Sequence, residues 1–192
     1  IINNMEKTYL TTPLYYVNDK PHIGHGYTTI LADVLARYNK LIGKDVFFLT
    51  GTDEHGQKVQ EAASKLGTTP QEHVDKFHKN YIELWEKLNI KYDKFIRTTD
   101  ADHIKSVKKV LKNLWDRGEI YIDEYEGLYS VSEERFITEK EYEEGNYREI
   151  KKLKEKNYFF KMSKYQKQLI DHINNNPDFI LPESRKNEIL GF

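Results

Sequence analysis

The stretch from Thr11 to His25, TTPLYYVNDKPHIGH, reads as a strand, a short loop and the start of a helix. A helix N-terminus carries unsatisfied N–H groups and the positive end of the helix dipole, so it can bind phosphate. His22 and His25 lie three positions apart, on one side of the first turn. Gly24 has no Cβ, which lets a ligand approach the backbone. The pattern indicates a polyphosphate site; the alternative is that two exposed histidines merely occupy a helix start.

A β–α–β unit surrounds this stretch. Residues 7–14 and 45–50 have the apolar content of buried strands, and residues 24–41 have helical spacing that ends at Gly43. We expect the second strand to be covered on both faces. The helix positions expected to face the core are Ile30, Leu31, Val34, Leu35, Tyr38 and Leu41. In such units ligands bind at the carboxyl ends of the strands, where the HIGH and GTDEHG segments both lie.

Asp53, in the GTDEHG segment, follows the second buried strand and faces the same crevice. A carboxylate there can hold an ammonium group by a charge-assisted hydrogen bond. The alternative is a metal site, because Asp53, Glu54 and His55 are ligand types; adjacent residues at a strand end point in different directions, which argues against it. The sequence contains no Walker A string and no GxGxxG, so it does not favour P-loop or dinucleotide binding.

The rest of the chain changes pattern at Gly118. Before it we expect helices over 57–66 and 70–88, a third strand over 92–98 and a helix over 99–118. That last helix is expected to turn inward Ile104, Val107, Val110, Leu111, Leu114 and Trp115. After it we expect a β-hairpin that turns at Glu126–Gly127, followed by an acidic helix and a basic run at 148–156. A strand over 158–162 and a helix over 165–174 should follow, and a last helix should begin at about residue 182. The pattern divides the chain into residues 1–118 and 119–192.

The composition excludes several classes of protein for this chain. The net charge is −1, from 30 Lys and Arg against 31 Asp and Glu, so there is no global basic field for nucleic acid and any RNA contact needs a local patch. The absence of cysteine excludes disulfides, thiolate zinc sites and a cysteine nucleophile. No apolar run approaches the roughly 18 residues of a membrane span. The expectation is a soluble, cytoplasmic protein without membrane or DNA partners, an organellar form remaining open.

The strings TTPLYYVN, PHIGHGYTT and FFLTGTDEHGQK, in this order and on these elements, resemble class I aminoacyl-tRNA synthetases, and among them the methionyl-tRNA synthetase family. The resemblance implies the first half of a Rossmann-like parallel-sheet nucleotide-binding domain of the HIGH type, followed by an inserted connective subdomain. It also implies ATP-dependent activation of methionine to methionyl adenylate and transfer of the methionyl group to tRNA(Met).

The resemblance also implies the site residues. ATP, accompanied by Mg²⁺, would lie at His22, Ile23, Gly24 and His25, with His22 and His25 as the catalytic pair. The amino group of L-methionine would meet Asp53, and the methionine side chain would meet Leu14 and Tyr16, with Pro13 in the adjacent backbone. Adenylate formation needs positioning and electrostatic stabilisation more than a general base, because a carboxylate is already a nucleophile.

Two features depart from the family pattern. Many relatives carry a zinc knuckle with cysteines where this chain has Ser130, Val131, Ser132 and Glu133, so the resemblance is to a variant without the knuckle, and no zinc is expected. Residues 161–164 spell KMSK, the start of the family's second signature, but they follow an aromatic strand within the connective subdomain. We interpret them as a strand-to-helix junction with Ser163 as the N-cap.

The resemblance covers the family's N-terminal portion, so we expect a longer protein to be the active enzyme and these residues alone to be inactive. Two alternatives remain: another adenylyl-transferring enzyme with HIGH chemistry, or a truncated, non-catalytic tRNA-binding paralogue. The basic run at 148–156 is either a contact for the tRNA acceptor stem or a solvated face balanced by nearby acidic residues.

Overall fold

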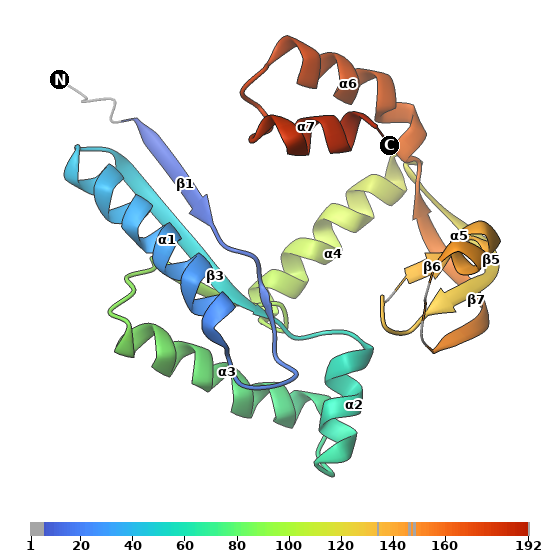
Figure 1. Cartoon of the computed structure of the whole chain (residues 1–192), viewed down its shortest axis with the longest axis horizontal. Helices are drawn as coiled ribbons and strands as arrows, with labels where there is room; N and C mark the ends of the chain where they lie inside the picture. Colours follow the sequence, from blue (N-terminus) through green and yellow to red (C-terminus); the bar gives the residue numbers. More distant parts are fainter. Residues whose placement is uncertain (1–5, 134, 146, 148, 192) are drawn as a thin grey trace. The chain divides into compact units, whose positions relative to one another are not determined.

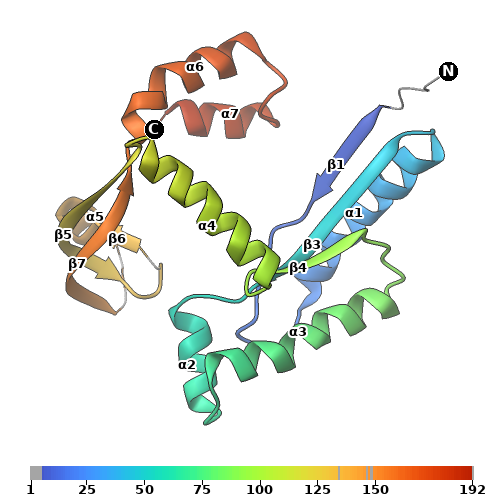
Figure 2. The same cartoon turned by 180° about the vertical axis from the view of Figure 1, so that it is seen from behind.

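The computed structural model describes residues 6–133, 135–145, 147 and 149–191. It divides into two compact units, whose boundary in the sequence falls between Lys108 and Lys109 (Figures 1 and 2). The assignment of residues 1–118 and 119–192 as separate functional domains stays a prediction. No described helix is long and apolar enough to cross a membrane.

The first unit is an α/β structure, as the sequence predicts. Its elements are β1 (Lys7–Thr11), β2 (Tyr15–Tyr16), α1 (Ile23–Leu41), β3 (Asp45–Asp53), α2 (Gln57–Lys65), α3 (Pro70–Lys87), β4 (Lys94–Arg97) and the first part of α4 (Ala101–Asp116). Strand β3 is central and pairs in parallel with β1, β2 and β4. Strand β1 ends at Thr11, just before Pro13, where the strand is expected to end because proline cannot donate to the ladder. Pairing resumes at Tyr15.

The core of this unit lies between the sheet and helices α1 and α3. Trp85 and Tyr81 of α3 pack with Phe48 of β3, Tyr15 of β2 and Ala36 of α1, and all five side chains are buried. Helix α3 therefore buries an apolar face that includes Val74, Tyr81 and Trp85. It begins with a capping box, in which Thr69 accepts from the Glu72 N–H.

The prediction for the inward face of α1 is wrong. Its buried residues are mostly small, namely Gly26, Thr29, Ala32, Asp33 and Ala36. The larger positions expected inside are exposed: Ile30, Leu31, Val34, Leu35, Tyr38 and Leu41. Apolar spacing shows that a helix has a stripe, but the side that faces the sheet is chosen by packing. Phe47 of β3 is also 46% exposed. The expectation that this strand is covered on both faces is therefore wrong.

The second unit is built on an antiparallel sheet. Its elements are the rest of α4, β5 (Ile120–Ser130), β6 (Arg135–Ile137), α5 (Glu139–Glu144), β7 (Ile150–Phe160), the 3₁₀ turn η1 (Met162–Tyr165), α6 (Gln166–Asn175) and α7 (Glu183–Leu190). Strand β5 pairs with β6 on one side and with β7 on the other. The predicted acidic helix is confirmed as α5, and the two predicted C-terminal helices are confirmed as α6 and α7. Helix α4 buries none of the residues expected to face inward.

The predicted turn at Glu126–Gly127 is wrong. Strand β5 runs straight through these residues, and Gly127 pairs with Leu153 of β7. A Cβ on Gly127 would lie 2.9 Å from the Tyr125 ring and 3.3 Å from the Phe136 ring. Glycine is therefore present because aromatic rings cover the strand there, and the chain instead reverses between Ser130 and Arg135.

Candidate active site at the strand ends

The start of helix α1 is a capping box made by two histidines. His22 is the N-cap, and its Nδ1 accepts from the Gly24 N–H at 3.1 Å. The His22 N–H in turn donates to Nδ1 of His25 at 3.2 Å, and the two rings stack with centroids 3.7 Å apart. The predicted helix start is confirmed to within one residue. The HIGH segment therefore forms a fixed unit rather than two independent side chains.

This geometry sets where the ring protons lie. In both histidines Nδ1 accepts a hydrogen bond from a backbone N–H, so a neutral ring carries its proton on Nε2. Burial, with a smaller contribution from the charge of His22, lowers the pKa of His25 below its ordinary value of 6.5. His25 is therefore neutral at pH 7 and still holds an N–H donor at Nε2.

Gly24 and Ile23 lie in the same turn. A Cβ on Gly24 would lie 3.0 Å from Cε1 and 3.1 Å from Nδ1 of His22, so glycine makes room for the histidine ring that caps the helix. The sequence reasoning assigned that space to a ligand. The Ile23 side chain is 92% exposed.

Residues expected to bind methionine meet through the pairing of β2 and β3. The parallel register places Tyr16 opposite Asp53. Leu14 and Pro13 are exposed in the segment between β1 and β2. The Asp53 side chain is half-buried, and we find no hydrogen-bond or ion-pair partner for its carboxylate among the described residues. An accessible, unpaired carboxylate at a strand end suits a cationic group.

Tyr15 connects the two predicted binding regions, a role that the sequence reasoning missed. Its ring centroid lies 4.7 Å from that of His25, and its hydroxyl hydrogen-bonds the Thr29 hydroxyl at 2.8 Å. The Tyr15 ring also stacks on Tyr81, with centroids 5.9 Å apart, and the Tyr81 hydroxyl donates to the Tyr16 carbonyl at 2.9 Å. The start of α1 and the end of β3 are thus held to one strand, β2. The aromatic pair Tyr15–Tyr16, separated from the HIGH segment by residues 17–21, is the signal that could have indicated this.

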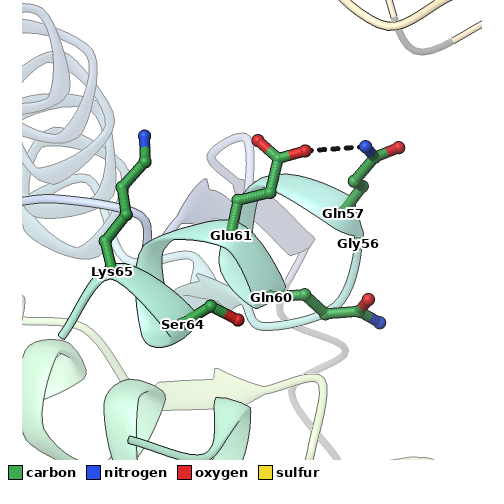
Figure 3. A pocket seen from close by; sticks show the side chains of 6 residues that line it. All are labelled: Gly56, Gln57, Gln60, Glu61, Ser64 and Lys65. Atoms are coloured by element: carbon green, nitrogen blue, oxygen red, sulfur yellow. Dashed lines mark hydrogen bonds between the residues drawn. The ribbon is translucent and has the colours of Figure 1, made fainter. Parts of the chain in front are cut away.

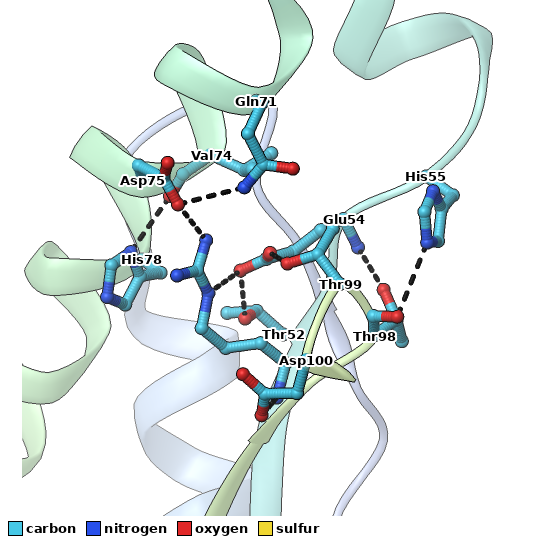
Figure 4. A network of polar contacts seen from close by, with 11 residues as sticks. Thr52, Glu54, His55, Gln71, Val74, Asp75, His78, Thr98, Thr99 and Asp100 are labelled. Atoms are coloured by element: carbon cyan, nitrogen blue, oxygen red, sulfur yellow. Dashed lines mark hydrogen bonds and ion pairs between the residues drawn. The ribbon is translucent and has the colours of Figure 1, made fainter. Parts of the chain in front are cut away.

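The metal interpretation of Asp53, Glu54 and His55 finds no support, because the three side chains have different surroundings. The Glu54 carboxylate is fully buried against Arg97, and the His55 ring lies 3.4 Å from the Thr98 carbonyl (Figure 4). No group of three His, Cys, Asp or Glu side chains among the described residues could hold a metal ion.

A separate hollow lies along α2, with a volume of about 590 Å³ (Figure 3). Gln57 donates to Glu61 across it at 2.6 Å. Its lining is formed by Gly56, Gln57, Gln60, Glu61, Ser64 and Lys65. None of the residues predicted to bind ATP or methionine lines this hollow.

In the second unit the KMSK segment is a structural junction. Lys164 forms an ion pair of 2.6 Å with the buried carboxylate of Glu119, and the Lys161 N–H donates to the Glu119 carbonyl at 2.9 Å. These contacts hold together the first residues before β5 and those after β7. The predicted Ser163 cap is wrong: Ser163 lies inside the turn η1, and the N-cap positions here make no side-chain cap bond.

The basic run forms much of strand β7 rather than a segment before it. Lys152 pairs with Glu126 at 3.1 Å and Lys154 with Glu124 at 3.4 Å, across the ladder to β5. These pairs favour the interpretation as a solvated, balanced face. Arg148, the first residue of the run, lies outside the described residues.

The turn between β5 and β6 contains the segment 130–133, where the sequence leads us to expect no zinc. Ser130 is fully buried, and its hydroxyl lies 3.1 Å from the Ser132 hydroxyl. The Glu133 N–H donates to the Ser130 hydroxyl at 3.3 Å. Serine hydroxyls therefore stabilise this turn by hydrogen bonds.

Comparison with known proteins agrees with this architecture. The methionine–tRNA ligase of Clostridium perfringens is 53% identical over 186 residues, which cover 95% of this chain and 29% of that protein. The methionine–tRNA ligase of a Nostoc species is 50% identical, with coverage of 100% and 38%. The structure of Mycobacterium tuberculosis methionyl-tRNA synthetase in complex with methionyl-adenylate matches with a TM-score of 0.91 and 41% identity, over 98% of this chain and 38% of that one.

The chain thus spans about a third of the length of these relatives. The family model for class I tRNA synthetases (M) matches residues 8–147, which is more than half of the chain. It includes the first unit, its parallel sheet and the HIGH and GTDEHG segments. The chain therefore belongs to the class I tRNA synthetases of the methionine type.

Proposed function

We propose that this chain is the N-terminal part of a methionine–tRNA ligase. The observation that carries the proposal is the register of β2 and β3, which places Tyr16 opposite Asp53. The Asp53 carboxylate has no partner among the described residues, and Tyr15, the neighbour of Tyr16 on β2, contacts His25. An ammonium site and a phosphate site thereby share one strand. The 50% to 53% identity to named methionine–tRNA ligases supports methionine as the amino acid.

In the proposed reaction Asp53 holds the α-ammonium group of methionine, and the side chain lies against Leu14 and Tyr16 beside Pro13. One carboxylate oxygen of methionine attacks the α-phosphorus of ATP, the bond from that phosphorus to the bridging oxygen breaks, and pyrophosphate leaves. The 3′-terminal hydroxyl of tRNA(Met) then attacks the methionyl carbonyl, and AMP leaves. The chain's contribution to the first step is alignment of two anions that otherwise repel.

ATP would lie at the start of α1, along the backbone of residues 22–25. His22 and His25 would donate from Nε2 to phosphate oxygens, since their Nδ1 atoms are occupied by the capping box. Donors fixed before the reaction stabilise charge that develops on phosphate without reorganisation. Mg²⁺ would accompany ATP and neutralise phosphate charge through the nucleotide's own oxygens. The family resemblance and the serine-stabilised turn at Ser130 support a second unit without zinc.

The test is methionine-dependent ATP–pyrophosphate exchange by the longest open reading frame that contains these residues. We expect exchange with methionine and background rates with the other amino acids. Exchange with a different amino acid would assign another HIGH-type enzyme. Binding of tRNA without exchange would indicate a non-catalytic paralogue. A parallel assay of residues 1–192 alone should give no exchange, since the chain spans about a third of its relatives.

A further inference from the structure

The residues on either side of Asp53 take part in a buried polar network (Figure 4). The Glu54 side chain is 0% exposed. Its carboxylate accepts from the Thr52 hydroxyl at 2.8 Å, from Nε of Arg97 at 2.8 Å and from the Thr99 hydroxyl in a short hydrogen bond. Asp53 therefore lies between two residues, Thr52 and Glu54, whose side chains bond each other.

A hydrogen bond also fixes the backbone that follows Asp53. The Glu54 N–H donates to the Thr98 hydroxyl at 2.9 Å. A second guanidinium nitrogen of Arg97 pairs with Asp75 of α3 at 2.6 Å. The network thus joins the ends of β3 and β4 to helix α3, and it restricts the peptide groups on the carboxyl side of Asp53.

Glu54 cannot itself contact a ligand, because its carboxylate is buried and accepts from three donors. A buried carboxylate is costly unless it is paired and fully hydrogen-bonded, and an apolar pair often fills such a space at lower cost. Arg97 pairs with the Glu54 carboxylate, so Glu54 is engaged within the network while the Asp53 carboxylate has no partner among the described residues. Burial opposes protonation of Arg97, yet its hydrogen bonds to Glu54 and Asp75 outweigh this and raise its pKa.

We propose that Glu54, with Arg97 and Thr99, is a positioning residue that directs the Asp53 carboxylate toward the α-ammonium group of the amino-acid substrate. This inference rests on the proposed function of Asp53. The network acts on methionine affinity because it fixes the backbone from which Asp53 projects. The ATP residues lie on a different element, α1, so nucleotide affinity does not depend on it.

The experiment measures KM for methionine and KM for ATP separately, by pyrophosphate exchange with the full-length protein. Thr99→Val keeps the side-chain shape and removes the donor to Glu54, whereas Thr99→Ser keeps the hydroxyl. We expect Thr99→Val and Glu54→Gln to raise KM for methionine about 10- to 100-fold, the loss expected for misplaced reacting groups, with KM for ATP within about twofold. Thr99→Ser should restore KM for methionine.

Asp33→Asn is the matched control. Asp33 is also a buried carboxylate bonded by an arginine, with Arg37 Nε at 2.6 Å and the Lys91 N–H at 2.8 Å, but it lies on α1 away from Asp53. It should lower the melting temperature without changing KM for methionine. If it raises that KM as much as Thr99→Val does, loss of stability explains both, and the positioning role is refuted.

Asp53→Asn separates the inference from the function on which it rests. If it raises KM for methionine while Thr99→Val and Glu54→Gln leave KM unchanged, the positioning role fails and the methionine site stands. If Asp53→Asn also leaves KM unchanged, the proposed ammonium site itself fails. Should Glu54→Gln not fold, the comparison of Thr99→Val with Thr99→Ser decides.

Discussion

Replacement of His22 separates its role in the helix from its proposed role at phosphate. His22→Ala removes one cap hydrogen bond, that from the Gly24 N–H at 3.1 Å, which costs about 1 kcal/mol of stability. It also removes one N–H donor proposed to contact phosphate, and loss of one such donor reduces kcat about 100- to 1,000-fold. A factor of 100 corresponds to about 2.7 kcal/mol, so the catalytic loss should exceed the stability loss.

The second variant, His22→Asn, distinguishes the two effects. Asparagine is a favourable N-cap whose side-chain oxygen can accept from Gly24 N–H, but its amide is shorter than the imidazole and does not reproduce the Nε2 donor. Stability should therefore return to the original value while exchange stays low. The assays are urea unfolding and methionine-dependent pyrophosphate exchange, both on the full-length protein.

Thr69→Ala provides the control, since Thr69 forms the capping box of α3 and accepts from the Glu72 N–H at 3.2 Å. It should lose about 1 kcal/mol of stability with exchange unchanged. An exchange rate for His22→Ala within threefold of the unsubstituted protein refutes the phosphate assignment. Full recovery of exchange in His22→Asn would mean that His22 acts only as a helix cap.

Three further predictions follow from other contacts. The folded state lowers the pKa of His25, so below about pH 6.5 the unfolded state binds more protons than the folded state does. The contribution of neutral His25 to stability is therefore present above that pH and is lost as pH falls through the folded pKa. The melting temperature should depend less on pH in His25→Asn than in the unsubstituted protein. Gly51→Ala should destabilise the first unit by about 3 kcal/mol or more, seen as loss of soluble protein, because the new Cβ would overlap the Ile96 carbonyl of β4; equal stability would contradict the β3–β4 register. Lys164→Ala should lower the melting temperature, since it removes the 2.6 Å ion pair of the buried Glu119 carboxylate and leaves the longer contact with Arg117 at 3.9 Å. Exchange by the full-length protein should stay within about twofold, and a 100-fold loss would mean that this lysine acts in catalysis.

Local patterns predicted the frame of the first unit well. The β–α–β order and the HIGH segment at a helix start depend on neighbouring residues, and the structure confirms both. The family resemblance rested on the same local strings and is confirmed by the match over residues 8–147. The individual roles of His22, His25 and Asp53 stay predictions.

Patterns failed where distant residues decide the outcome. Gly127 reads as a turn residue, but the rings of Tyr125 and Phe136 pack where its Cβ would be and keep it within a strand. Helix α1 shows an apolar stripe, yet the side that packs on the sheet carries Ala32 and Ala36. In both cases the choice depends on which surface comes close, and local spacing does not contain that information.

The sequence by itself determined the family, the order of the elements and the segments that meet at the strand ends, because those follow from short strings and local periodicity. Only the tertiary structure decided that the rings of His22 and His25 form the capping box at the start of α1, and that Glu54 is bonded to Arg97. The same holds for the Asp53 carboxylate, which has no partner among the residues that the structure describes. Glu54 and Arg97 are 43 positions apart in the chain. Pairing of buried charges over such a distance is set by strand register and helix packing, since a buried charge takes whichever partner the fold brings within reach.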